Sequence, residues 1–249
     1  MNPLERWLRI LVAGAGLGVV TLPVLLAMLF LWPSRAARIR LGCRYGHLIG
    51  TVGARILGFR FAIDGRERAQ ALMPAIYVVN HASALDLLLG LAMVPIGACA
   101  IAKKEMARVP FLGQAYLLSG HLLIDRSDKS RTIAAMDEVA RQMQAHRLGA
   151  WIWPEGTRSP DGTLKRFKKG FVHLALATRL PVVPIVILDA PARWPARTLD
   201  FRPGTLHVQV LDPIDTSRWR QDQVAEHAEA VRQVIAGRLP EHQRPVAAD

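Results

Sequence analysis

Residues 75–86 read AIYVVNHASALD and carry the clearest signal for how this chain folds. The apolar run at 75–79 predicts a short buried strand, and Ser83 followed by Asp86 has the form of a capping box that begins a helix. His81 then lies in the turn between strand and helix, with Asp86 in the first helical turn. Across such a turn the two side chains can meet, as a general base and the carboxylate that fixes its tautomer require. A polar loop residue and a helix cap are the alternative explanation of these two residues.

The alternation of strand and helix continues along the chain. Strand-like runs occur near residues 59–64, 75–79, 97–102, 121–124, 150–153, 182–188 and 205–211, and helical patterns occur at 129–146 (behind the candidate cap Asp128), 168–178 and 221–238. This order predicts an α/β fold, a single αβ sandwich whose central, mostly buried mixed sheet is flanked by helices. We place this domain at residues 58–239, before a polar tail at 240–249 that is expected to fray.

A second polar segment, WPEGTRS at 153–159, follows the strand expected at 150–153. Gly156 allows the backbone to approach a ligand closely, and its amide is a candidate donor to an oxyanion. The planar guanidinium of Arg158 suits a phosphate group. Glu155 is acidic, so we expect it to hold Arg158 or another basic neighbour rather than phosphate.

Four motifs in this order resemble the glycerolipid acyltransferase family, in particular the type that acylates 1-acylglycerol-3-phosphate. They are H-x4-D at His81 to Asp86, GHLLIDR at Gly120 to Arg126, PEGTRS at Pro154 to Ser159 and LPVVPI at Leu180 to Ile185. Residues 103–113 also resemble a family segment between the first two motifs, and the match covers about residues 55–215. One departure is Trp153, where the family usually has Phe.

The resemblance implies an enzyme that moves a fatty acyl chain from acyl-coenzyme A or acyl carrier protein to the sn-2 hydroxyl of 1-acylglycerol-3-phosphate (lysophosphatidate), which forms phosphatidate for phospholipid biosynthesis. The implied site residues are His81 and Asp86 for catalysis; Arg126, Arg158, Lys103 and Lys104 for the substrate phosphate; and Glu155, Gly156 and Thr157 for other substrate contacts or the oxyanion. A glycerol hydroxyl becomes a further candidate partner for Glu155. Either lysine is equally explained as a solvated surface charge.

Acyl transfer from a thioester requires the acceptor hydroxyl to lose its proton as it attacks, and the carbonyl oxygen to find hydrogen-bond donors. The chain has no Gly-x-Ser-x-Gly motif, so we expect direct attack and interpret Ser83 as a helix cap rather than a nucleophile. Two other functions stay open: acyl transfer to another lysolipid, such as lyso-ornithine lipid, and a non-catalytic membrane-bound lipid-binding protein of the same fold. A base with an orienting carboxylate argues against the second.

The composition favours anionic partners, because the formal net charge is +12 and the pI is about 10.8. An anionic membrane and phosphate-bearing substrates fit this charge, and no signature of nucleic-acid binding is present. The basic run KRFKK at 165–169 suits lipid headgroups or the phosphates of coenzyme A, or is an ordinary exposed turn. Cys43 and Cys99 form no disulfide pattern, and the histidines lack the spacing of a zinc site, so we expect neither a metal nor a cofactor.

The N-terminal segment is apolar enough to reach a membrane. Residues 10–32 carry no charge, and 23 residues of helix can cross a bilayer core, although Pro23 also allows two half-helices that enter one leaflet and return. More arginines follow this run (35, 38, 40 and 44) than precede it (6 and 9), so if the segment spans the membrane, the catalytic domain is expected on the cytoplasmic side of the cytoplasmic membrane. Residues 35–57 are expected to form a helix that lies on the membrane surface or packs on the domain. We therefore assign residues 1–57 to a membrane anchor with a surface helix.

Overall fold

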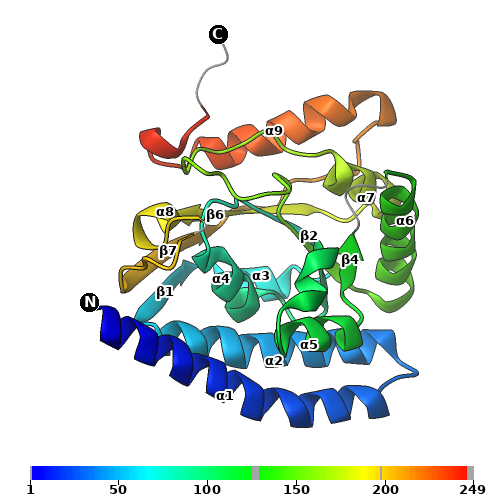
Figure 1. Cartoon of the computed structure of the whole chain (residues 1–249). Helices are drawn as coiled ribbons and strands as arrows, with labels where there is room; N and C mark the ends of the chain where they lie inside the picture. The colour runs from blue at the N-terminus through cyan, green and yellow to red at the C-terminus, as the bar shows by residue number, and fades with distance from the viewer. Residues whose placement is uncertain (1, 125–128, 197, 246–249) are drawn as a thin grey trace.

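The computed structural model describes residues 2–124, 129–196 and 198–245 (Figure 1). Its centre is a seven-stranded sheet in the order β1-β7-β6-β2-β5-β3-β4. The strands are β1 (Phe59–Asp64), β2 (Ile76–Val79), β3 (Ala98–Lys103), β4 (Leu122–Ile124), β5 (Gly149–Ile152), β6 (Val182–Leu188) and β7 (Gly204–Val210). Neighbouring strands run parallel except β6 and β7, which are antiparallel. The predicted mixed sheet is confirmed, and all seven predicted strands are present.

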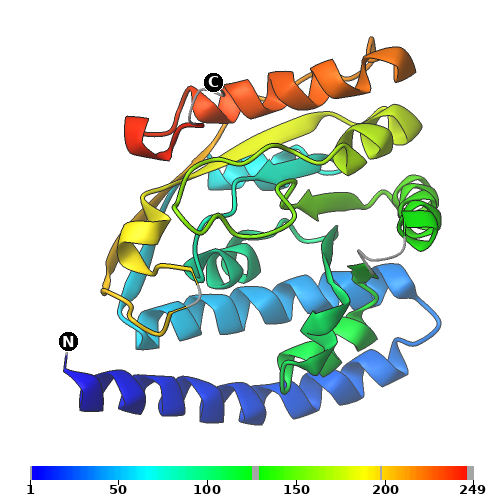
Figure 2. The same cartoon turned by 45° about the horizontal axis from the view of Figure 1, so that its top comes forward.

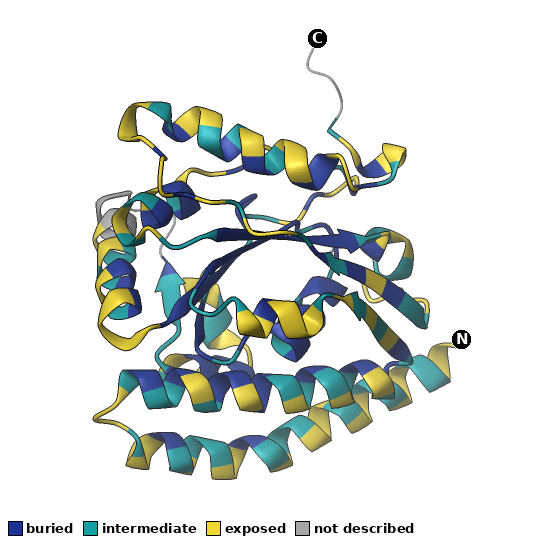
Figure 3. Cartoon of the chain, turned by 180° about the vertical axis from the view of Figure 1, so that it is seen from behind, coloured by how far each residue is buried: buried dark blue, intermediate teal, exposed yellow. Residues whose placement is uncertain are grey.

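Helices cover both faces of the sheet. They are α1 (Pro3–Phe30), α2 (Arg35–Ile56), α3 (Arg66–Ala71), α4 (Leu85–Met93), α5 (Leu112–Ser119), α6 (Lys129–His146), α7 (Gly170–Thr178), α8 (Ala190–Arg193) and α9 (Val224–Ala236). Figure 2 shows α7 and α9 over one face, α2 and α4 under the other, and α1 outermost beneath α2. The central strands β2 and β5 are buried along their whole length (Figure 3). Burial on both faces explains why these strands are unbroken apolar runs.

The predicted helices are present, with differences at their ends. The predicted cap of α6, Asp128, lies outside the described residues. The segment predicted at 221–238 begins as a 3-10 turn, Gln221–Gln223, before α9. Helix α4 begins at Leu85, and Ala84 rather than Ser83 is its N-cap. The capping box is therefore half formed: Asp86 Oδ2 accepts the Ser83 N–H at 2.8 Å, while the Ser83 hydroxyl accepts the N–H of Leu85 at 3.0 Å.

Helix α1 is one continuous helix that contains Pro23, so of the two alternatives for this segment the structure has the single helix and not the two half-helices. Its length and composition are sufficient to cross a membrane. It packs on α2 and α5 (Figure 2), and a 2.5 Å hydrogen bond joins the hydroxyls of Thr21 and Tyr45 between α1 and α2. Its other face is apolar and exposed.

Helix α2 packs closely on the domain. Packing on the domain was one of the two alternatives for residues 35–57. A Cβ on Gly50 would lie 2.6 Å from the backbone nitrogen of Ala92, so only glycine permits this approach to α4. Three arginines in the first turns of α2 donate hydrogen bonds to carbonyl oxygens of the domain: Arg35 to Gly120, Arg38 to Leu118 and Arg40 to His146. The basic cluster that follows α1 therefore fastens α2 to the ends of α5 and α6.

Candidate active site

The two polar segments meet at the carboxyl edge of the parallel strands. His81 follows β2, Trp153 follows β5, and Lys103 ends β3, so the topology brings residues far apart in sequence to one place. Asn80 fixes the start of the first segment, because its side chain donates to the carbonyl oxygen of Ile187 at 2.9 Å and accepts the Ile187 N–H at 2.7 Å. These bonds extend the pairing of β2 with β6 beyond Val79. The sequence analysis assigned no role to Asn80, although a polar residue directly after a buried strand was a signal for one.

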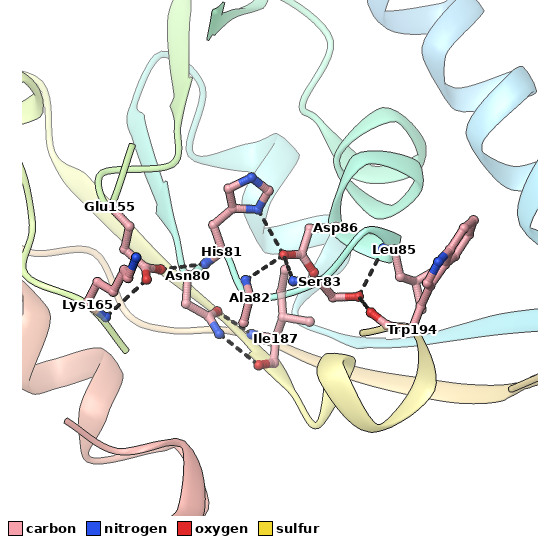
Figure 4. A network of polar contacts seen from close by, with 10 residues as sticks. All are labelled: Asn80, His81, Ala82, Ser83, Leu85, Asp86, Glu155, Lys165, Ile187 and Trp194. Atoms are coloured by element: carbon pink, nitrogen blue, oxygen red, sulfur yellow. Dashed lines mark hydrogen bonds and ion pairs between the residues drawn. The ribbon is translucent and has the colours of Figure 1, made fainter. Parts of the chain in front are cut away.

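His81 and Asp86 meet as the sequence predicted. The Nδ1 atom of His81 lies 2.9 Å from Asp86 Oδ2, and this oxygen also accepts the N–H groups of Ala82 and Ser83 at 2.8 Å each (Figure 4). Asp86 is almost fully buried and its side chain is held by three contacts. The carboxylate is an acceptor, so the hydrogen on the imidazole belongs on Nδ1 and the lone pair on Nε2. The geometry is that of an oriented general base.

Glu155 connects the two segments through the backbone. Its Oε1 accepts the His81 N–H at 2.6 Å and its Oε2 accepts the Lys165 N–H at 3.0 Å (Figure 4). A third bond, from the Ser159 N–H to the His81 carbonyl oxygen at 3.0 Å, ties the same loops. Of the partners expected for Glu155, Arg158 is not the one bound: the carboxyl oxygens accept from backbone amides, and the basic neighbour Lys165 is held through its backbone N–H. Burial raises the pKa of the Glu155 carboxyl to about 8, and the two N–H donors oppose that rise.

The PEGTRS turn forms one side of the site. Gly156 has a φ of 75°, and its N–H donates to the Trp153 carbonyl oxygen at 3.1 Å. This candidate donor to the oxyanion therefore forms a hydrogen bond within the turn itself. Thr157 and Arg158 line the cavity beside His81, and within the described part of the chain the Arg158 guanidinium has no hydrogen-bond or ion-pair partner.

The remaining predicted phosphate ligands are placed differently from one another. Lys103 lines the same cavity as Arg158 and His81. Lys104 is the first residue of the 3-10 helix Lys104–Arg108, outside the cavity lining. Arg126 lies outside the described residues. The structure thus brings Lys103, Arg158 and His81 together at one cavity, and we call the part of the cavity that they line its mouth.

A mostly apolar cavity of about 290 Å³ leads inward from this mouth. Its walls come from α2, α4, β3 and α5 and include Tyr45, Leu87, Leu91, Ile101, Met106 and Leu112. His121 lies deep in it, level with Ala100 of β3, whose N–H donates to His121 Nδ1 at 3.2 Å. Lys103 lies three residue steps after Ala100, which is about 10 Å along a strand. Burial lowers the pKa of His121 to about 4, so this imidazole is neutral at pH 7.

Ser83 is positioned as a structural residue. Its hydroxyl donates to the Trp194 carbonyl oxygen at 2.6 Å and accepts the N–H of Leu85, and the residue is fully buried. Both hydrogen-bonding functions of the hydroxyl are therefore used. Among residues 2–124, 129–196 and 198–245, no three His, Cys, Asp or Glu side chains are grouped as metal ligands.

Comparison with known proteins agrees with this site. A family model described as Acyltransferase matches residues 60–188, which include both polar segments. The 1-acyl-sn-glycerol-3-phosphate acyltransferase of Cocos nucifera is 38% identical over 97% of this chain and 80% of its own length. The protein of the same name from Escherichia coli K12 is 31% identical, and the match covers 82% of each chain.

A solved structure has the same fold. The crystal structure of the 1-acyl-sn-glycerophosphate acyltransferase PlsC from Thermotoga maritima superposes with a TM-score of 0.75 at 23% identity, over 94% of this chain and 92% of that one. The family match and the curated relatives establish the class of protein. This chain belongs to the acyltransferase family, and it is an enzyme that transfers acyl groups.

Proposed function

We propose that this acyltransferase moves a fatty acyl chain from a thioester donor to the sn-2 hydroxyl of 1-acylglycerol-3-phosphate and so forms phosphatidate for phospholipid biosynthesis. The observation that carries the proposal is the 2.9 Å contact between His81 Nδ1 and Asp86 Oδ2 at the mouth of an apolar cavity. This contact leaves Nε2 for the acceptor hydroxyl, and the cavity offers an apolar surface to an acyl chain. The names of the curated relatives supply the acceptor.

In the proposed reaction His81 is the general base. As the acceptor oxygen attacks the thioester carbonyl carbon, its proton passes to Nε2, and the imidazolium is held by the carboxylate of Asp86. The new C–O bond gives a tetrahedral oxyanion. Collapse of this intermediate breaks the C–S bond, and the imidazolium returns the proton to the leaving thiolate. Direct attack suits a site in which the hydroxyl of Ser83 is already bonded on both sides.

Arg158 and Lys103 are the proposed ligands of the acceptor phosphate. Both line the mouth with His81, and the guanidinium of Arg158 can donate two parallel hydrogen bonds to phosphate oxygens. Arg126 stays a proposed phosphate ligand because of the family resemblance. Lys104, the neighbour of Lys103, stays a weaker candidate for the same phosphate. Thr157, which lines the cavity next to Gly156, remains the candidate donor to the oxyanion.

Glu155 is proposed as a positioning residue rather than a substrate ligand. Its bonds to the backbone N–H groups of His81 and Lys165 set the distance between the base and the PEGTRS turn. An error of about 1 Å in such a distance can reduce turnover on the order of 100-fold. The residue thus acts on the reaction through His81.

We further propose that residues 1–57 attach the enzyme to the membrane, with α1 lying within one leaflet. Helix α1 packs along α2, which is fixed to the domain, while Leu11, Leu22 and Leu29 on α1 are more than half exposed. These leucines share one face with Gly18, where a Cβ would lie 3.3 Å from the Phe111 ring. Phe111 is itself 48% exposed, so the apolar surface continues from α1 onto the start of α5.

The last parts of the proposal are the acyl donor and the side of the membrane on which the catalytic domain lies. Acyl-coenzyme A and acyl carrier protein are both anionic, and the basic run at 165–169 adjoins the PEGTRS turn, where the Lys168 side chain lies against Gly156. Both donors are cytoplasmic, which fits a catalytic domain on the cytoplasmic side of the cytoplasmic membrane. Either donor satisfies the chemistry at His81.

The test is a product assay with purified, detergent-solubilised protein. Lysophosphatidate is supplied with acyl-coenzyme A or acyl carrier protein, and wild type is compared with His81→Ala. Thioester loss matched by phosphatidate in the wild type alone supports the reaction, the acceptor and the base together. Thioester loss without phosphatidate would contradict the acceptor and point to another lysolipid. No turnover with either donor would contradict the proposed reaction.

A further inference from the structure

Trp153 lies directly against the proposed base. The centroids of the indole and the His81 imidazole are 5.1 Å apart, with 31° between the ring planes. The far edge of the indole packs on Gly90 of α4, where a Cβ would lie 2.8 Å from Trp153 Cζ2. Trp151 packs edge-on against the same indole at 6.1 Å. Glycine at position 90 therefore provides the room in which a large aromatic ring is wedged beside His81.

The charge of His81 changes during the proposed reaction, whereas the charge of its aromatic neighbour does not. The groups that face His81 are Asp86 at Nδ1, Glu155 at the backbone N–H, and Arg158 and Lys103 across the mouth. Asp86 stabilises an imidazolium, and the two cations oppose it. An indole face attracts a cation through its quadrupole and does not repel an anionic substrate, as a further carboxylate would.

We infer that Trp153 is a positioning residue that stabilises the imidazolium form of His81 in the transition state through its indole face. This inference rests on the proposed role of His81 as general base. The interaction is strongest when the proton has been transferred, so it lowers the barrier instead of strengthening substrate binding. Tryptophan has the most negative aromatic face, so it should exceed phenylalanine, the residue usual at this place in the family that the chain resembles.

The test is a graded series at one position. Trp153→Phe, Trp153→Leu and a variant with pentafluorophenylalanine at 153 are compared with wild type for kcat, KM and the pH at which activity falls by half on the acid side. Phenylalanine and its fluorinated form have nearly the same shape, but fluorination reverses the charge of the ring face. We expect kcat to fall about 3-fold in Trp153→Phe and about 10-fold or more in the fluorinated and Leu variants, with KM unchanged.

The acid limb of the pH profile, on which activity falls as the pH is lowered, is the measurement that a merely structural role of Trp153 would not change. Loss of the aromatic face makes the imidazolium less stable, so the base stays unprotonated to lower pH. The half-activity point should therefore move to lower pH in the fluorinated and Leu variants. Trp219→Phe is the matched control, because Trp219 stacks on His227 beside α9, away from the mouth, and should leave all three quantities unchanged.

The outcomes separate the inference from the proposal beneath it. Equal kcat and equal acid limbs in the Phe and fluorinated variants, with His81→Ala inactive, would overturn the role of Trp153 alone. Activity in His81→Ala would overturn both. A Leu variant that fails to fold does not affect the test, since the Phe and fluorinated pair carries it.

Discussion

The mouth of the cavity and helix α1 are built by opposite means. At the mouth, Asp86 and Glu155 are 1% and 4% exposed, and each carboxyl group is fixed by hydrogen bonds of 2.6–3.0 Å to the loops around His81. On α1, Leu22 is 62% exposed and Phe30 is 87% exposed. The first region gains its order from buried polar contacts, and the second leaves a large apolar surface without protein to cover it.

The difference indicates a division of labour. Short, buried hydrogen bonds hold reacting groups at fixed distances, which is what proton transfer requires. An uncovered apolar helix contributes affinity for a lipid surface and sets no distances at the base. Changes at the mouth should therefore reduce turnover however the substrate is presented, and changes on α1 should matter only when the substrate is in a bilayer.

The largest effect is expected from His81→Ala. Removal of a general base reduces kcat on the order of 100- to 10,000-fold, in detergent and on vesicles alike. The fold should survive, because the side chain of His81 is partly exposed and its one hydrogen-bond partner among the described residues is Asp86. Initial rates and a melting curve provide the check, with His207→Ala, whose side chain is exposed on β7, as the matched control. A rate within 3-fold of wild type would rule out His81 as the base.

The next effect is expected from Glu155→Gln. One amide nitrogen must then face a backbone N–H, so kcat should fall about 10- to 100-fold through displacement of His81. Stability should change as well. The pKa of Glu155 is about 8 in the folded protein against 4.5 for the free group, so the folded state retains a proton that the unfolded state loses.

The sign of the pH dependence follows from that difference. Between pH 4.5 and 8 the folded state binds more protons, so the free energy of unfolding should fall as pH rises, by a few kcal/mol at most. Urea unfolding at several pH values measures the slope. In Glu155→Gln this contribution should disappear, and an unchanged slope would show that the carboxyl titrates normally in the folded protein.

Arg158→Ala should act on binding. Loss of a charge-assisted hydrogen bond to phosphate raises the KM for lysophosphatidate about 10-fold and leaves the KM for the donor near its wild-type value. The exposed Arg218, before η2 (Gln221–Gln223), offers the control Arg218→Ala. If an acceptor without phosphate suffered the same loss, Arg158 would have another role.

The smallest effect is expected on α1. Leu22→Glu introduces a charge into the exposed apolar face, so activity and sedimentation with anionic vesicles should fall several-fold while activity in detergent is retained. Val234→Glu, on the opposite side of the molecule in α9, is the matched control. Equal vesicle binding by Leu22→Glu and wild type would refute the membrane role of this face.

The same division explains what could be predicted from the sequence. The central strands β2 and β5 were predictable because strands buried on both faces must be continuous apolar runs, and the His81–Asp86 contact followed from a strand–turn–helix pattern. The role of Glu155 was not predictable. Its partners are backbone amides of His81 and Lys165, and backbone groups leave no trace in residue identity.

Two questions that the sequence left open have similar causes. The Gly156 amide was a candidate donor to the oxyanion, but whether an N–H closes its own turn depends on dihedral angles that the sequence does not fix. Pro23 allowed a break in α1, yet a proline inside a helix, which removes one hydrogen bond and clashes with the preceding turn, can bend a helix without ending it. The arginines after α1 indicated a membrane boundary, and their bonds to Gly120, Leu118 and His146 show that they also cap helices of the domain.

The central claim is that the mouth performs the chemistry and α1 presents it to the membrane. The most direct measurement is the ratio of phosphatidate formation on anionic vesicles to that in detergent, for wild type, His81→Ala and Leu22→Glu. We predict that His81→Ala loses activity in both settings and that Leu22→Glu loses it on vesicles only, so the ratio falls. An equal loss in detergent and on vesicles for Leu22→Glu would contradict the separation of the two regions.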